Sequence, residues 1–337
     1  FATASRGTVP VGCKIIARHL GSIYLAGDPT DPNEWYKSRN GDPYDWLFSD
    51  TDAGAATKGS LGEAYVIRDA IVGMIPYADR YMLFGCRNSF YRMSGDVTDG
   101  GSIDALDYNI GLASSTSWCY GKNAGEVFLL TPNNGIYATR IDCPTCHLVP
   151  LSGDTLPREL RGISEDLEVS MTYDAVNRGV HIFLTPNVAT EATMPAPTHW
   201  FFDLTTNGFF LVSYADKGHN PVASVWYPAV ASDDRCVLLA GFNGDVLRYS
   251  RTAENDCGQS INAYVLLGPL MLGQAGFGTG MVADLWANLS ADSANVTWSL
   301  YTGDRAENVV SGTAKATGTF RAGSKVHSTP RRGGGAW

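Results

Sequence analysis

A motif of about fifty residues recurs along the first 250 positions and limits the folds open to this chain. In each copy a turn rich in Asp, Gly or Arg leads into a hydrophobic run, a second turn follows, and a strand then places an aromatic beside a basic residue. Copies span 22–39, 79–95, 125–141, 178–187 (continuing into 198–214) and 234–250. If Leu25, Leu83, Leu129, Phe183 and Leu238 are equivalent, the spacings are 58, 46, 54 and 55 residues.

Repeats of roughly 40–50 residues with several strands each are typical of β-propeller blades. The 37 glycines and 11% aromatics favour strands and turns, and helical periodicity is nearly absent. The best helix candidate, 281–289, suits a strand equally well. We therefore predict an all-β fold, a β-propeller-like repeat of about 46–58 residues per blade with a C-terminal β-sandwich-like appendage. Generic β-hairpins in two stacked sheets are the alternative.

The pattern changes near residue 262, which predicts a propeller-like region at 1–261 and a C-terminal β appendage at 262–337. The apolar run 264–272 is interrupted by Gly268 and Pro269, and we expect it to be a buried strand. No apolar run approaches the roughly 20 residues that span a bilayer, so no membrane insertion is expected. The start at Phe1 and the abrupt apolar end at Trp337 favour a processed chain or a truncated fragment.

The charge and the cysteines restrict the partners. A net charge of −9 argues against a general nucleic-acid-coating surface, because phosphate binding needs a basic footprint. The seven cysteines are odd in number and scattered. Cys86 and Cys236 lie within apolar strand candidates, and we expect them to be small buried hydrophobes in a reducing compartment.

Several motifs admit a chemical interpretation, each with a structural alternative. CPTCH at 143–147 matches a c-type haem attachment sequence, half of a zinc site or a local disulfide, and is equally a turn between blades. GQAGFGTG at 273–280 resembles a dinucleotide loop but lacks the βαβ context. The Asp-rich turns at 27–35, 41–46, 49–54 and 94–104 could bind calcium, although Asp favours turns anyway.

Catalytic signatures are weak. The six histidines lack ligand spacing, and we expect His181 and His199, in strand candidates, to be hydrogen-bonded structural residues. The sequence contains no G-x-S-x-G or H-E-x-x-H motif, and its 34 acidic residues do not single out a glycosidase pair. We therefore predict no catalytic, cofactor-binding or metal-binding residues and no cofactor.

Aromatic and basic residues recur together and allow two interpretations. The pairs are Trp35 with Lys37 and Arg39, Tyr91 with Arg92, Tyr137 with Arg140, and Tyr249 with Arg248. They could form a stripe facing nucleic acid or a partner subunit, but strand alternation, with the ring inside and the cation outside, is the favoured interpretation. Trp35, Trp46 and Trp200 lie in loop-rich stretches, where we expect them to be exposed and able to stack on sugars.

Several stretches resemble virion proteins of tailed bacteriophages, especially the propeller-bearing tail or nozzle (tail tubular) proteins of short-tailed phages. They are SIYLAGDPTDPNEWYKSRNGDPYDW at 22–46, IPYADRYMLFGCRNSFYRMSGD at 75–96, LLAGFNGDVLRYS at 238–250, YVLLGPLMLG at 264–273, GTFRAG at 318–323 and PRRGGGAW at 330–337. The resemblance implies a subunit of a ring around the DNA-ejection channel and carries no functional residues with it.

The sequence thus predicts a non-enzymatic structural virion protein of a phage tail or nozzle, assembled in the bacterial host cytoplasm. Its expected partners are further copies in a homo-oligomeric ring, neighbouring tail, adaptor and fibre proteins, and DNA passing transiently through the channel. An acidic channel wall would let DNA slide. The alternatives are a propeller glycoside hydrolase or sialidase-like enzyme and a carbohydrate- or receptor-binding module of a virion.

Overall fold

The chain forms two compact units, residues 1–261 and 262–337, in a computed structural model. The structure describes residues 4–61, 69–77, 80–122, 125–133, 135–140, 148–164, 166–250, 253, 255–261, 264–268, 270–272, 280–310, 312–323, 326–328 and 334–335.

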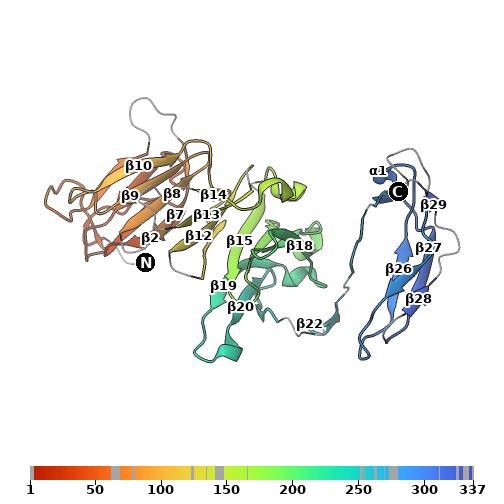
Figure 1. The fold of residues 1–337 in the computed structure, drawn as a ribbon. Helices are drawn as coiled ribbons and strands as arrows, with labels where there is room; N and C mark the ends of the chain where they lie inside the picture. Colours follow the sequence, from red (N-terminus) through yellow and green to blue (C-terminus); the bar gives the residue numbers. More distant parts are fainter. Residues whose placement is uncertain are drawn as a thin grey trace. The chain divides into compact units, whose positions relative to one another are not determined.

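The first unit contains five antiparallel sheets that follow one another in chain order (Figure 1). The first sheet has the order β2(Ile15–His19), β3(Ser22–Ala26), β4(Glu34–Lys37) and β6(Thr57–Ser60), with a small parallel pair of β1(Arg6–Gly7) and β5(Asp45–Trp46). The second contains β7(Ile71–Tyr77), β8(Tyr81–Cys86), β9(Phe90–Ser94) and β10(Ser102–Asp107). The third contains β11(Trp118–Tyr120), β12(Glu126–Thr131), β13(Gly135–Arg140) and β14(Val149–Pro150).

The fourth and fifth sheets complete this series. The fourth contains β15(Leu167–Asp174), β16(Gly179–Pro186), β17(His199–Asp203) and β18(Gly208–Val212). The fifth has three described strands, β19(Pro221–Tyr227), β20(Cys236–Gly241) and β21(Val246–Arg248). A hairpin of β22(Asn255–Asp256) and β23(Gln259–Ser260) follows, and short 3₁₀ turns lie at Gly153–Thr155, Arg158–Leu160, Glu191–Thr193, Lys217–His219 and Ser232–Asp234.

The repeat read from the sequence coincides with these sheets. Leu25, Leu83, Leu129, Phe183 and Leu238 lie on β3, β8, β12, β16 and β20, which are the second strands of the five sheets. One copy of the motif therefore corresponds to one sheet. The predicted fold class, all-β with a propeller-like repeat, is confirmed.

Strand alternation explains why the middle sheets are almost uniformly hydrophobic. On β8, Met82 and Phe84 enter the core shared with the first sheet, whereas Leu83 enters the core shared with the third. On β12, Val127 faces back toward the second sheet and Phe128 faces the fourth. Because successive side chains point to opposite faces, a sheet covered on both sides needs apolar residues at every position.

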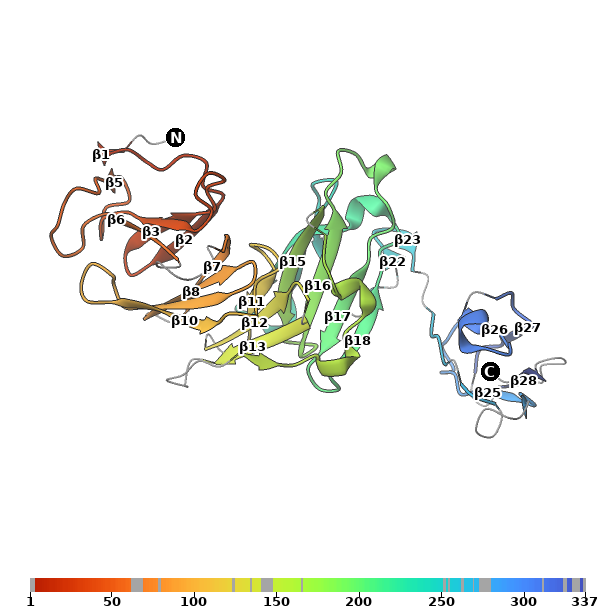
Figure 2. The ribbon, with the colours of Figure 1, turned by 90° about the horizontal axis from the view of Figure 1, so that it is seen from above.

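At three of the four junctions the sheets pack through their first strands, as blades do around a propeller axis. β2 lies against β7, β11 against β15, and β15 against β19. Figures 1 and 2 both show the sheets succeeding one another from the red first sheet to the green fourth sheet. A small core of Phe183, Val237 and Leu239 joins the fourth sheet to the fifth.

The second unit is built from two-stranded sheets. β24(Gly280–Met281) pairs with β29(Gly334–Gly335), β25(Leu285–Ala287) with β28(Val326–Ser328), and β26(Val296–Leu300) with β27(Ala316–Phe320). The ambiguous stretch 281–289 forms strand rather than helix. A five-residue helix, α1(Ala306–Val310), was not predicted.

The prediction that 264–272 is a buried strand is wrong. Its described residues belong to no strand, and Val265 and Leu267 are 84% and 82% exposed. Apolar composition predicts burial only where a neighbouring element covers the segment. No helix among the described residues is long and apolar enough to cross a membrane.

Candidate binding site

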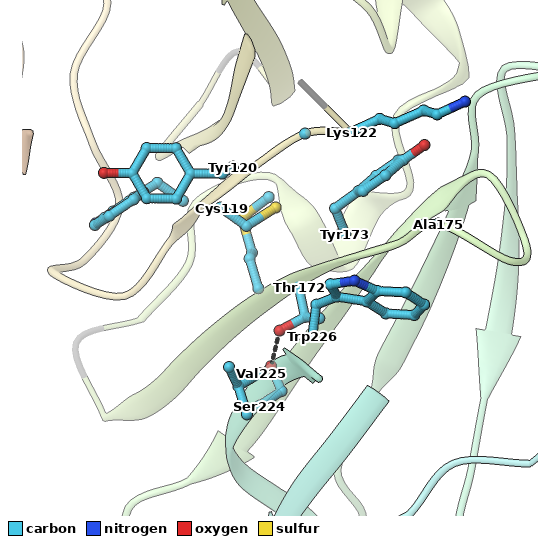
Figure 3. Close-up of a pocket in the computed structure, with 12 residues that line it drawn as sticks. Cys119, Tyr120, Lys122, Thr172, Tyr173, Ala175, Ser224, Val225 and Trp226 are labelled. Atoms are coloured by element: carbon cyan, nitrogen blue, oxygen red, sulfur yellow. Dashed lines mark hydrogen bonds between the residues drawn. The ribbon is translucent and has the colours of Figure 1, made fainter. Parts of the chain in front are cut away.

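A cavity of about 440 Å³ lies where the first strands of the third, fourth and fifth sheets meet (Figure 3). Strands β11, β15 and β19 contribute its walls. Its lining residues are Trp118, Cys119, Tyr120, Gly121, Lys122, Met171, Thr172, Tyr173, Ala175, Ser224, Val225 and Trp226. The cavity is therefore built by strands that are distant in sequence and are brought together by the stacking of sheets.

Aromatic rings dominate the cavity. Trp118 and Tyr120 come from β11 and lie edge to face with centroids 5.1 Å apart, Tyr173 comes from β15, and Trp226 comes from β19. Burial raises the pKa of both Tyr120 and Tyr173, so their phenols stay protonated at neutral pH. The Trp118 indole N–H already donates to the Ser115 carbonyl, and the Tyr120 hydroxyl donates to the Pro76 carbonyl, so these two residues offer their flat ring faces for stacking.

The polar part of the cavity is a pair of hydroxyls and one ammonium group. Thr172 Oγ1 donates to Ser224 Oγ at 2.7 Å, and Ser224 Oγ also lies 2.7 Å from Ser170 Oγ. Lys122 is the one cationic side chain among the lining residues (Figure 3). Burial raises the pKa of the Cys119 thiol, so this cysteine is not poised as a thiolate nucleophile.

These groups can bind a ligand. Aromatic faces, hydroxyls and an ammonium can hold a polar ring-shaped ligand such as a sugar. The described lining residues include no Asp or Glu, whereas most glycoside hydrolases use a pair of carboxylates.

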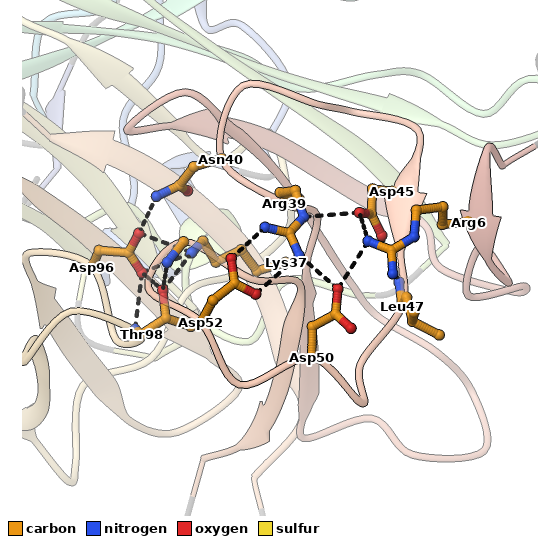
Figure 4. Close-up of polar contacts among 11 residues, drawn as sticks. Arg6, Lys37, Arg39, Asn40, Asp45, Leu47, Asp50, Asp52, Asp96 and Thr98 are labelled. Atoms are coloured by element: carbon orange, nitrogen blue, oxygen red, sulfur yellow. Dashed lines mark hydrogen bonds and ion pairs between the residues drawn. The ribbon is translucent and has the colours of Figure 1, made fainter.

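The Asp-rich turns 41–46 and 49–54 are held by arginines (Figure 4). The guanidinium of Arg39 contacts Asp45 at 2.8 Å, Asp50 at 2.6 Å and Asp52 at 2.6 Å, and Arg6 contacts both Asp45 and Asp50. The backbone amide of Leu47 and the Arg39 side chain lower the pKa of Asp45. These turns are organised by internal ion pairs. Within the described part of the chain, no group of three or more His, Cys, Asp or Glu residues could hold a metal ion.

The turn 94–104 contains a second polar cluster (Figure 4). Asp96 accepts hydrogen bonds from Lys37 Nζ, Asn40 Nδ2 and Thr98 Oγ1. The Lys37 side chain is completely buried, which contradicts the expectation that the cation of each aromatic–basic pair points outward. Tyr91 is buried as expected, but the Arg92 side chain is only 15% exposed and its Nε is buried, so this pair does not place its cation fully outside.

Two of the three tryptophans that were predicted to stack on sugars are buried. Trp35 and Trp46 are only 4% and 3% exposed, so their predicted exposure is wrong. Trp46 Nε1 donates to the carbonyl of Pro43, and Trp35 packs in the core between the first two sheets. Trp200 is half-buried on β17. Loop-rich sequence near a Trp does not predict exposure, because the loop itself can fold over the ring.

Both strand histidines have structural partners, as predicted. His199 Nδ1 accepts from the Leu184 amide at 3.1 Å, so Nε2 carries the proton and donates to Asn220 Oδ1 at 2.8 Å. His181 Nε2 lies 3.3 Å from Asp174 Oδ2, and its ring stacks on Phe183. Among the cysteines, Cys86 and Cys236 are buried and free, again as predicted.

Two sequence motifs involve residues that the structure does not describe. CPTCH at 143–147 lies outside the described residues, as do residues 273–279 of GQAGFGTG. The cavity at β11, β15 and β19, in contrast, was not predicted from the sequence. The signal that could have found it is that Tyr120, Tyr173 and Trp226 all lie on first strands of successive repeats.

No protein-family model matches the chain, and no curated protein matches it. Among solved structures, the β-propeller domain of Cps50 (Swd1) from Myceliophteria thermophila is similar with a TM-score of 0.41 and 9% identity, over 68% of this chain and 67% of that one. An ancestral GH74 enzyme is similar with a TM-score of 0.41 and 10% identity, over 67% of this chain and 28% of the enzyme.

Proposed function

We propose that the chain is a structural, non-catalytic subunit of a ring-shaped assembly in a bacteriophage tail. The supporting observation is that the stacked sheets end in an uncovered apolar face. On the fifth sheet, Val225, Tyr227 and Val246 are 58%, 51% and 75% exposed. Contiguous exposed apolar residues on a folded sheet mark a surface that contacts another macromolecule.

The resemblance to phage tail and nozzle proteins specifies the assembly. In this proposal, further copies complete the ring, and neighbouring tail, adaptor and fibre proteins contact its rims. The net charge of −9 suits a wall past which DNA slides without being held. The protein is then located in the virion after assembly in the host cytoplasm.

The test is to find the chain in particles. Purified tailed phage particles from a host that expresses this sequence should contain the protein in several copies, as quantified by mass spectrometry. Antibodies against the chain should label the tail by electron microscopy. Its absence from purified particles contradicts the proposal.

A second candidate function, a carbohydrate- or receptor-binding module, is favoured by the cavity at β11, β15 and β19. Its test is glycan-array binding, with Trp226→Ala expected to abolish any signal because the indole is the stacking surface. A matched Trp286→Ala variant, whose ring is exposed on the second unit, serves as the control. Retained binding in Trp226→Ala would exclude this cavity as the glycan site.

A further inference from the structure

The outward face of the fifth sheet is an apolar strip. On β19, Ser224 faces the fourth sheet through its hydroxyl contacts, so the alternate residues Ala223, Val225 and Tyr227 face away. Cross-strand pairing adds Leu238 of β20 beside Val225. Val246 of β21 is paired with Ala240 on the same face.

The outward face of the first sheet exposes apolar surface at β2, whereas Tyr36 of β4 on the same face is buried beside Phe48. Ala17 of β2 packs into the core shared with the second sheet, so Ile16 and Arg18 face away. Ile16 is 70% exposed, and its cross-strand partner Leu25 is half-buried on the same face.

The chain itself shows how two such faces meet. First strands lie side by side at three of the four junctions between successive sheets, β2 with β7, β11 with β15 and β15 with β19. β2 and β19 belong to the first and last sheets of the series, and among the described strands the main first-strand neighbours of these two are β7 and β15. Figures 1 and 2 show the intervening sheets between these ends.

We propose that β19 of one copy packs against β2 of the next copy, so that the row of sheets continues across the subunit boundary. This inference rests on the proposed function and specifies its interface. The contact joins two different surfaces, so every copy can bind one neighbour through β19 and another through β2. When the same contact is repeated from copy to copy, the assembly closes into a ring if the successive rotations return to the first copy.

Charge supports a second copy as the occupant. On the first sheet, exposed Lys14 and Arg18 flank Ile16. On the fifth sheet, the apolar strip is flanked by three exposed carboxylates, Asp233 and Asp234 at the β19–β20 hairpin and Asp245 before β21, and by two exposed cations, Arg235 and Arg248. Cations on one face and an excess of carboxylates over cations on the other favour the heterologous pairing over either face meeting itself. Arg248, also on the fifth sheet, donates to the carbonyl oxygen of Asp233 and lies 3.9 Å from the Asp234 carboxylate.

The test uses the full chain and two charge insertions at exposed positions, Ile16→Glu on β2 and Val225→Glu on β19. Sedimentation velocity over a range of protein concentrations should show oligomers for the wild-type chain. Each variant alone should be monomeric, because each lacks one half of the junction. Val230→Glu is the matched control, since Val230 is fully exposed in the β19–β20 hairpin and should leave assembly unchanged.

Mixing the two variants gives the sharpest outcome. Ile16→Glu retains an intact β19 face and Val225→Glu retains an intact β2 face, so an equimolar mixture should form a dimer and stop there. A mixture that stays monomeric, or an Ile16→Glu variant that dimerises alone, overturns the heterologous junction. The proposed junction is also wrong if the wild-type chain remains monomeric at every concentration. It is equally wrong if the ring closes through contacts with another protein instead of through β19 and β2.

Different results would contradict the β19–β2 junction and the role in a phage tail. If particles contain the protein and incorporate both variants as well as the wild type, the junction is wrong and the tail role stands. If the mixture dimerises in solution but the protein is absent from particles, the junction stands and the tail role is wrong. Circular dichroism of each variant should match the wild type, because both substitutions lie at exposed positions.

Discussion

Lys37 Nζ donates to both carboxylate oxygens of Asp96, at 2.7 and 2.8 Å, although the Lys37 side chain is completely buried. Lys37 belongs to the first sheet, and Asp96 lies in the turn between β9 and β10 of the second. Thr98 Oγ1 accepts a further hydrogen bond from the same ammonium group at 3.0 Å. A buried charge is tolerated when it is paired and hydrogen-bonded, so this contact fixes the junction of the first two sheets.

Removing the carboxylate should therefore destabilise the first unit strongly. We expect Asp96→Asn to lower the free energy of unfolding by about 3 kcal/mol, because it leaves the Lys37 ammonium buried without a counter-charge. Urea denaturation measures this change. Asp99→Asn in the same turn is the control, since Asp99 is exposed, and it should stay within about 0.5 kcal/mol of the wild type. Equal effects of the two substitutions would contradict this role of the ion pair.

The same pair predicts a pH dependence. Burial by itself would raise the pKa of Asp96, but hydrogen bonds from Lys37, the Thr98 amide and Asn40 outweigh burial and lower the pKa to about 2. A lowered carboxyl pKa contributes stability that is present above the unfolded value and is lost as pH falls through the folded value. The wild type should therefore lose about 2 kcal/mol more than Asp96→Asn between about pH 4 and 2. Urea midpoints across that range test it, and parallel curves would contradict it.

His199 predicts a second pH dependence at higher pH. Burial lowers its pKa to about 4, despite an opposing hydrogen bond to Asn220. The folded state thus holds a neutral imidazole, while the unfolded chain gains a proton below its ordinary pKa near 6.5. Stability should fall by up to about 3 kcal/mol between about pH 6.5 and 4. The difference between wild type and His199→Gln isolates this contribution, and a difference that does not change with pH would contradict it.

The repeat could be predicted because the features that define it lie close together in the sequence. A hydrophobic run between two turns recurs, and its five aligned positions lie on the second strands of five sheets. The position of Cys86 and Cys236 within apolar strand candidates also predicted that these two cysteines are buried, whereas the buried Cys119 was not predicted. These features need only the period of the side chains and the residues that turns require.

The interior positions of charged and aromatic loop residues were not predictable in this way. Lys37 is buried because Asp96, distant in sequence, lies opposite it, and Trp46 is buried because its own loop folds over it. The cavity at β11, β15 and β19 likewise depends on which sheets stack. Conversely, residues 264–268 and 270–272 are apolar but exposed, because no described strand pairs with them.

The cysteines predict a pattern of chemical reactivity. Burial raises the pKa of Cys86 to about 12, and the Cys86 side chain is completely buried. Cys257 is exposed. Brief treatment of the native protein with iodoacetamide should therefore modify Cys257 and spare Cys86, whereas both should react in urea. Peptide mass spectrometry reads the result, and native labelling of Cys86 would contradict its burial.

The close approach of Gly59 to the Trp35 ring leads to the last prediction. They are directly opposed on β6 and β4, and a Cβ added to Gly59 would lie 2.5 Å from Trp35 Cζ2. Since Trp35 is buried in the core between the first two sheets, its ring has little room to move. We expect Gly59→Ala to lower the free energy of unfolding by about 1–3 kcal/mol through overpacking.

A double-mutant cycle separates this clash from a general effect of replacing glycine. Trp35→Phe removes the ring atoms that the new methyl would meet, so Gly59→Ala should cost at least about 1 kcal/mol less in that background. Gly318→Ala provides a comparison, because a Cβ there would lie at the same 2.5 Å from Trp298 Cζ2, but that ring is only half-buried and can shift. Its cost should be smaller than that of Gly59→Ala. Additive costs for Gly59→Ala and Trp35→Phe would show that the buried indole is not what excludes a side chain at position 59.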